Sequence, residues 1–78
     1  MIRKYVIKNN IRTLRFFANE MTQQELADRI GASRQTVIAI EAGKYSPSLE
    51  MSFRIADAFG VKIDEVFSYE IVDEDKKE

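Results

Sequence analysis

The segment 22–44 carries the start and end signals of two short helices with a tight turn between them. Thr22 is suited to cap the first helix, because Glu25 three residues later completes a capping box with it. Gly31 follows where a left-handed residue would end that helix, and Ser33 offers a cap for the next one. Two helices joined by so short a turn must cross steeply, so the segment predicts helix-turn-helix geometry.

Apolar side chains recur on one face of each predicted helix. Leu26, Ala27 and Ile30 have helical spacing in the first helix, and Val37 and Ile40 have it in the second. Ala27 is small enough to let the second backbone come close to the first. These side chains are therefore expected to form the buried contact that sets the crossing angle.

The motif resembles that of the Cro and phage-repressor (XRE) type of helix-turn-helix transcriptional regulators, especially their short stand-alone members. The matching residues are Thr22-Gln23, Leu26-Ala27, Gly31, Ser33, Val37, Ile40 and Glu41-Ala42-Gly43-Lys44, followed by Ser46-Pro47-Ser48-Leu49, Ile55-Ala56, Gly60-Val61 and Val66-Phe67. The similarity covers roughly residues 11–67. The stretch from Arg15 to Thr22 is one residue longer than the commonest family spacing. The resemblance implies an all-α, five-helix, phage-repressor-like DNA-binding domain.

Further elements are expected on either side of the motif. A strand is predicted over the first eight residues, which are rich in branched and aromatic types. A helix is predicted over residues 10–18, another from Leu49 to its end at Gly60, and a short one over 63–67. The inward side chains are expected to be Ile11, Leu14 and Phe17 or Ala18 in the first of these helices, and Leu49, Phe53, Ala56 and Phe59 in the second.

The last apolar residues alternate with polar ones. Phe67, Tyr69 and Ile71 are separated by Ser68 and Glu70, which is the period of a strand with one buried face. Residues 69–72 are expected to pair antiparallel with residues 2–7 in a small two-stranded sheet. An isolated pair of strands is marginal in water, so the last helix or a second subunit must support it. The sequence thus predicts one domain over residues 1–72 and a charged, disordered tail over 73–78.

Charge is segregated along the chain, although the net charge is only −1. Residues 1–44 contain eight basic and four acidic side chains, a net charge of +4. Residues 45–78 contain four basic and nine acidic side chains, a net charge of −5. The basic half, which holds the motif, is suited to meet phosphates, and the acidic half is expected to face away from them.

Composition argues against several function classes. The chain has no cysteine, no histidine and no glycine-rich phosphate loop, so an enzyme, a metal site or a cofactor is not expected. Without disulfides, a signal region or a membrane span, the protein is expected to be soluble and cytoplasmic. Its 78 residues leave no room for a separate effector domain, so a small-molecule effector is not expected either.

The second motif helix should lie in the major groove of double-stranded DNA, where side chains near its start reach base edges. Arg34 matches guanine O6 and N7, and Gln35 matches adenine N6 and N7, although both could instead form an ordinary solvated face. The predicted DNA-binding residues are Gln23, Ser33, Arg34, Gln35, Thr36, Ala39, Lys44 and Tyr45. The family resemblance places Ala39 toward the groove and makes Gln23 a phosphate-contacting residue. Lys44 and Tyr45 are the other phosphate candidates, with an ordinary surface lysine and a ring packed on the next helix as the alternatives.

Other residues are expected to be structural. The resemblance pairs Arg15 with Glu41, which would tie the first helix to the end of the third. The phenylalanines are expected in the core or a dimer contact rather than as stacking platforms: Phe16, Phe17, Phe53, Phe59 and Phe67.

The favoured function is a sequence-specific regulator, with repression as the family default, that acts as a homodimer on a palindromic operator. One recognition helix contacts too few bases to select a genomic site. The dimer surface is predicted to contain Val66, Phe67, Tyr69 and Ile71. The alternative is a protein-interaction module, such as an antitoxin or a polymerase-bridging factor, that uses the same fold to hold a partner.

Overall fold

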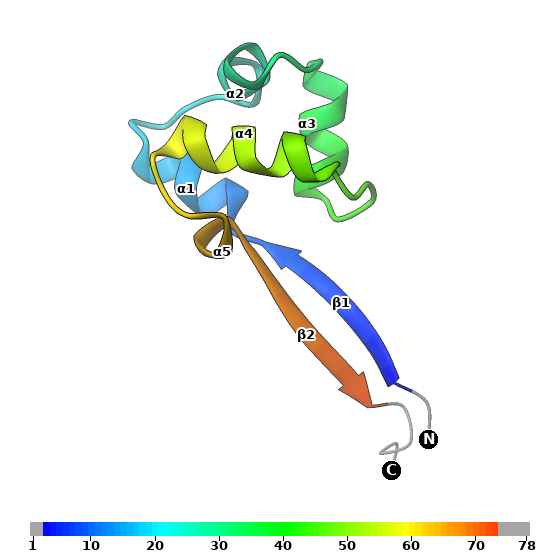
Figure 1. The fold of residues 1–78 in the computed structure, drawn as a ribbon. Helices are drawn as coiled ribbons and strands as arrows, with labels where there is room; N and C mark the ends of the chain where they lie inside the picture. The colour runs from blue at the N-terminus through cyan, green and yellow to red at the C-terminus, as the bar shows by residue number, and fades with distance from the viewer. Residues whose placement is uncertain (1–2, 74–78) are drawn as a thin grey trace.

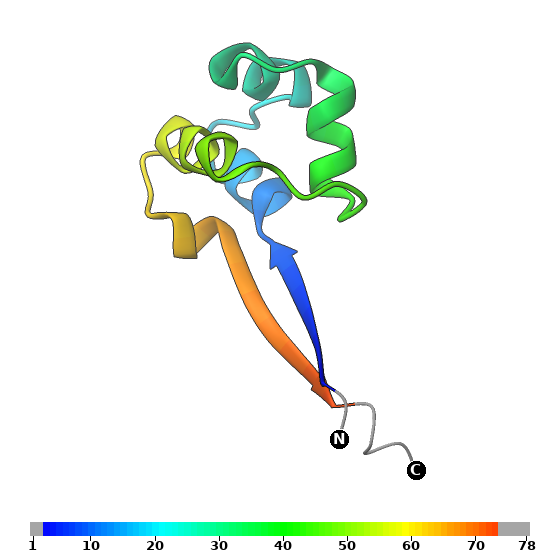
Figure 2. The same cartoon turned by 45° about the vertical axis from the view of Figure 1, so that its right-hand side comes forward.

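Five helices form a single body from which a two-stranded ribbon projects (Figures 1 and 2). The computed structural model describes residues 3–73. The elements, in chain order, are β1 (Arg3–Asn9), α1 (Ile11–Phe17), α2 (Gln23–Ile30), α3 (Arg34–Glu41), α4 (Leu49–Phe59), α5 (Ile63–Val66) and β2 (Phe67–Asp73). The predicted class, five helices with a small antiparallel sheet, is confirmed.

The two motif helices begin and end as their sequence predicts. The Thr22 hydroxyl accepts a hydrogen bond from the Glu25 amide at 3.0 Å, and the Glu25 carboxylate accepts one from the Thr22 amide at 2.8 Å. Gly31 ends α2 in the left-handed conformation, with φ at 72°. Ser33 caps α3 by accepting from the Thr36 amide at 3.1 Å. Local capping chemistry therefore sets both helix boundaries.

The core lies among all five helices. The motif contributes the predicted face, and α1, α4 and α5 close over it. The buried apolar residues are Ile11, Met21, Leu26, Ala27, Ile30, Val37, Ile40, Ile55, Ala56 and Val66. Leu14, Ala18 and Phe59 pack against this cluster at its edge, as expected.

Several predicted inward residues are exposed. Phe17 is 77% exposed and packs edge-on against Phe16, which is also exposed, so neither belongs to the core. In α4, Leu49 is 71% exposed and Phe53 is exposed as well. Ala56 is buried and Phe59 is half-buried, as predicted, and Ser52 and Ile55 complete the buried stripe of α4 in place of Leu49 and Phe53. The Ser52 hydroxyl donates to the Ser48 carbonyl at 2.9 Å, which removes the cost of burying that polar group.

The chain between Arg15 and Thr22 leaves α1 through a left-handed turn. α1 ends at Phe17, and Asn19 and Glu20 then have φ values of 61° and 55°. The Met21 amide donates to the Arg15 carbonyl at 2.9 Å, and this bond returns Met21 to the core.

The ribbon pairs β1 with β2 along their whole lengths. The strands are antiparallel, with Arg3 opposite Asp73 and Asn9 opposite Phe67. α5 ends at Val66, so Phe67 begins the strand instead of ending the helix, and Asp73 belongs to the strand rather than to the predicted tail. The rest of that tail, residues 74–78, and the predicted strand residues 1–2 lie outside the described residues.

One face of the ribbon is apolar and uncovered. Its side chains are each more than half exposed: Tyr5, Ile7, Tyr69 and Ile71. The rings of Tyr5 and Tyr69 stack with their centroids 5.2 Å apart. The prediction of a sheet with a buried face is therefore wrong for a single copy of the chain, because the ribbon extends beyond the helices that were expected to cover it (Figure 1).

The longest helix within residues 3–73 is α4, with 11 residues, and none has the length and apolar character needed to cross a bilayer.

Candidate nucleic-acid interface

α3 is held by one face and presents the other to solvent. Val37 and Ile40 are buried, whereas Arg34 and Gln35 are exposed at the start of the helix. Ile38 follows Gln35 by three residues and lies on the same outward face. The two predicted base-reading side chains are thus free to meet a ligand while the backbone that carries them is anchored.

Two of the α3 residues that were predicted to contact DNA, Thr36 and Ala39, are less exposed than Arg34 and Gln35. The Thr36 hydroxyl lies 2.9 Å from the Ser33 hydroxyl, so Thr36 and Ser33 share the cap of the helix. Ala39 and Thr36 are both half-buried. Arg34 and Gln35 are thus more exposed than Thr36 and Ala39, and Ser33 is exposed but caps the helix.

An ion pair with little exposure fixes the far end of α3. The Arg15 guanidinium donates from Nε to Glu41 Oε1 at 3.1 Å and from Nη2 to Glu41 Oε2 at 2.9 Å. Its Nη1 donates to the Met21 carbonyl at 2.9 Å. The two side chains are only 16% and 14% exposed. The predicted tie between the first and third helices is confirmed.

Asn9 is a second anchor that sequence reasoning missed. Its side-chain amide donates to the carbonyls of Ile40 and Glu41 at 3.1 and 3.3 Å, and its side-chain oxygen accepts from the Ile11 amide. Ile11 begins α1, whose N-cap residue is Asn10, so the Asn9 side chain supplies the acceptor for the first amide of the helix. Because Asn9 is also the last residue of β1, the same side chain connects the ribbon to the C-terminal end of α3.

The predicted phosphate contacts lie at both ends of the motif. Gln23 is the first residue of α2 and is half-buried. Lys44 and Tyr45 follow Gly43, whose φ of 77° turns the chain out of α3, and both are exposed. Tyr45 is 53% exposed, so its ring is not buried against α4.

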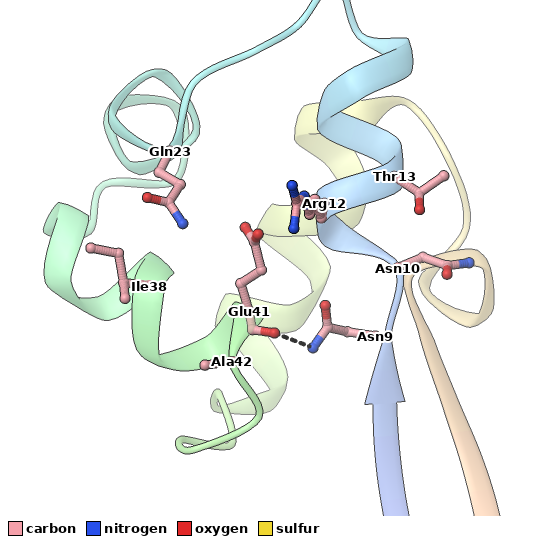
Figure 3. Close-up of a pocket in the computed structure, with 8 residues that line it drawn as sticks. All are labelled: Asn9, Asn10, Arg12, Thr13, Gln23, Ile38, Glu41 and Ala42. Atoms are coloured by element: carbon pink, nitrogen blue, oxygen red, sulfur yellow. Dashed lines mark hydrogen bonds between the residues drawn. The ribbon is translucent and has the colours of Figure 1, made fainter.

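A hollow of about 360 Å³ lies between α1, α2 and α3 (Figure 3). Gln23 borders it on α2, and Ile38, Glu41 and Ala42 border it on α3. The lining is completed by Asn9, Asn10, Arg12 and Thr13, which join the end of β1 to the start of α1.

The predicted dimer residues differ in their exposure. Val66 is 1% exposed and belongs to the core, so it is unavailable to a partner and that part of the prediction is wrong. Phe67 is half-buried at the base of the ribbon. Tyr69 and Ile71 lie on the exposed apolar face. Their exposure agrees with the expectation that the end of the chain carries more apolar residues than so small a core needs.

Comparison with known proteins adds family evidence to this geometry. The helix-turn-helix family model matches residues 11–66. An uncharacterized HTH-type transcriptional regulator of Methanocaldococcus jannaschii is 53% identical over 64 residues, which cover 82% of this chain and 96% of the relative. The cryptic phage CTXphi transcriptional repressor RstR of Vibrio cholerae is 36% identical over 63 residues, covering 81% of this chain and 56% of that protein.

The fold also occurs among solved structures. A candidate DNA-binding protein from Bacteroides fragilis superimposes with a TM-score of 0.71 at 24% sequence identity. The match covers 81% of this chain and all of that one. This likeness supports the fold alone.

Proposed function

Because the chain belongs to the XRE-type helix-turn-helix family and is a DNA-binding transcriptional regulator of that type, we propose that it is a sequence-specific repressor that binds a palindromic operator as a homodimer. The observation that carries the proposal is the outward pair Arg34 and Gln35 on a helix anchored at both ends. Similarity to a phage transcriptional repressor supports repression as the outcome of binding.

Arg34 and Gln35 select the bases in this proposal. A guanidinium donates two hydrogen bonds to guanine O6 and N7, and a carboxamide both donates to and accepts from adenine. Each well-formed pair discriminates against a wrong base by about 1–3 kcal/mol. Anchoring α3 through Glu41 and Asn9 reduces the entropy lost when these side chains bind, because the helix is already in place.

Gln23, Lys44 and Tyr45 hold the duplex backbone. They lie at the start of α2 and after the end of α3, on either side of the base-reading residues. Contacts of this kind fix the register of the protein on the duplex without reading its sequence. They supply affinity that falls as salt rises, because each neutralised phosphate releases counterions.

A second copy of the chain covers the apolar face of the ribbon in this proposal. One recognition helix contacts too few base pairs to select a site in a genome. A two-fold dimer would place two copies of α3 about 34 Å apart, one duplex turn, and therefore bind an inverted repeat. Tyr69 and Ile71 supply exposed apolar surface for such a contact. We place the protein in the cytoplasm and assign it neither a catalytic step nor a small-molecule effector.

Selection of bound duplexes from a random pool tests the assignment of the base-reading residues. We expect the unaltered protein to enrich an inverted repeat. Arg34→Ala and Gln35→Ala should each lose preference at particular positions, by about 1–3 kcal/mol per contacted base pair. Lys44→Ala is the control, because losing a phosphate contact should weaken all sequences alike. If neither Arg34→Ala nor Gln35→Ala changes the enriched sequence, α3 does not read bases through these side chains.

A further inference from the structure

We propose that the hollow between α1, α2 and α3 binds a backbone phosphate of the duplex, with the Arg12 guanidinium as its cationic ligand. The inference rests on the proposed function and extends the DNA-contacting surface to α1. From the sequence alone, Arg12 is one of the eight basic residues in the N-terminal half of the chain.

The hollow adjoins the face of α3 that carries Gln35. Ile38 and Ala42, which form its α3 wall, follow Gln35 by three and seven residues. This spacing places all three on one side of the helix. A duplex that receives Gln35 in its major groove therefore brings the strand bordering that groove alongside the mouth of the hollow.

Two polar side chains reach toward this opening from different helices. Figure 3 shows Gln23 extending from α2 and Arg12 from α1 on either side of the hollow. Both can donate hydrogen bonds to a phosphate oxygen, and the guanidinium also supplies positive charge. Gln23 is already proposed to contact a phosphate, and the hollow places Arg12 where it can donate to the same phosphate.

The charges around the hollow favour an anion. Glu41 is the acidic residue in its lining, and both of its carboxylate oxygens are occupied by Arg15. Arg12 is exposed, and no carboxylate within residues 3–73 forms an ion pair with it. Arg12 consequently leaves one positive charge uncompensated beside an open polar hollow, which attracts a phosphate.

The test measures duplex binding by fluorescence anisotropy over a range of salt concentrations, using the full chain and a duplex that it enriches. Arg12→Ala should weaken binding roughly fivefold at low salt and reduce the slope of log affinity against log salt by about one, without changing the preferred sequence. Arg12→Lys should recover most of the slope, because a lysine keeps the charge. Arg29→Ala is the matched control, since Arg29 borders a different hollow, beside Ala18 and Asn19, and its loss should leave the slope unchanged.

Duplexes with a single neutral methylphosphonate linkage locate the phosphate. One linkage in each half-site should weaken binding by the unaltered protein and weaken binding by Arg12→Ala clearly less, because both changes remove the contact of Arg12 with that phosphate and only the Gln23 contact remains to be lost. Additive effects at every linkage, or a salt slope for Arg12→Ala equal to that of Arg29→Ala, would overturn the inference while leaving base reading intact. Failure of the unaltered protein to prefer any sequence would overturn the proposed function as well.

Discussion

Tyr69→Asp and Ile71→Asp are each expected to convert the proposed homodimer into a folded monomer and to lower its affinity for a palindromic duplex on the order of 100-fold. Both side chains lie on the exposed apolar face of the ribbon, where a carboxylate would have to be buried without a partner in the dimer. The same carboxylate is hydrated in the monomer, so folding of the helical body should be unaffected. Sedimentation equilibrium gives the oligomeric state, and anisotropy gives the affinity.

The large effect on DNA binding follows from losing the link between two half-site contacts. In a dimer, binding of the first copy of α3 holds the second near its half-site at a high effective concentration. A monomer keeps its own base contacts and loses that advantage. Its affinity for a single half-site should therefore equal that of the unaltered chain, and this equality separates loss of dimerisation from damage to the recognition helix.

Val72→Asp is the matched control for these substitutions. Val72 is also an exposed apolar residue of β2, but it lies on the opposite face of the ribbon because side chains alternate along a strand. It should leave the dimer intact. If Val72→Asp dissociates the dimer as fully as Tyr69→Asp, or if Tyr69→Asp remains dimeric, the apolar face is not the contact between subunits.

Point substitutions are preferable to deleting the chain after Gly60. Such a deletion would remove Val66, which is buried in the core, and would break the hydrogen bond between the Asn10 amide and the Val66 carbonyl. The resulting loss of dimer could then reflect unfolding rather than a missing interface.

Arg15→Met should lower the free energy of unfolding by about 3 kcal/mol, which is a substantial part of the total free energy of unfolding of a domain of this size. The substitution leaves the Glu41 carboxylate with little exposure and without its two charged hydrogen bonds. Glu41→Gln should cost less than half as much, because its amide oxygen still accepts a hydrogen bond and Arg15 keeps the Met21 carbonyl. Urea unfolding followed by circular dichroism measures both values.

The double variant Arg15→Met with Glu41→Met distinguishes the contribution of the Arg15–Glu41 ion pair to stability from the contribution of Arg15 side-chain packing. Replacing both charges by apolar side chains removes the unpaired carboxylate, so most of the stability lost in Arg15→Met should return. A double variant as unstable as Arg15→Met alone would show that the arginine stabilises the fold through its own packing and its bond to Met21, rather than by neutralising Glu41.

The parts of the fold that depend on local chemistry were predictable. Thr22, Glu25, Gly31 and Ser33 act on amides within a few residues of themselves, so their spacing defined the motif helices. The prediction that Leu49 and Phe53 of α4 are buried was wrong for the opposite reason. Leu49 and Phe53 are large apolar residues of that helix, but the face that becomes buried depends on where the other helices lie.

The same distinction applies to the candidate site. Exposure of Gln35 follows from its position on the side of the helix opposite Val37 and Ile40, whereas Arg34 is exposed at the first position of the helix. The anchoring role of Asn9 could not be predicted, because its side chain contacts carbonyls 31 and 32 residues away. The hollow beside Arg12 likewise exists only once three helices have come together.

In the proposed assembly, two chains joined through their ribbons present two copies of α3 to one two-fold site. Its most direct test is the affinity for duplexes that differ only in the separation of the enriched half-sites, with stoichiometry measured by analytical ultracentrifugation. We predict two chains per duplex and a sharp optimum with half-site centres about 10 base pairs apart. Inserting about five base pairs turns one half-site to the opposite side of the helix and should lower the affinity on the order of 100-fold. One chain per saturated duplex, or an affinity unchanged by that insertion, would contradict this assembly.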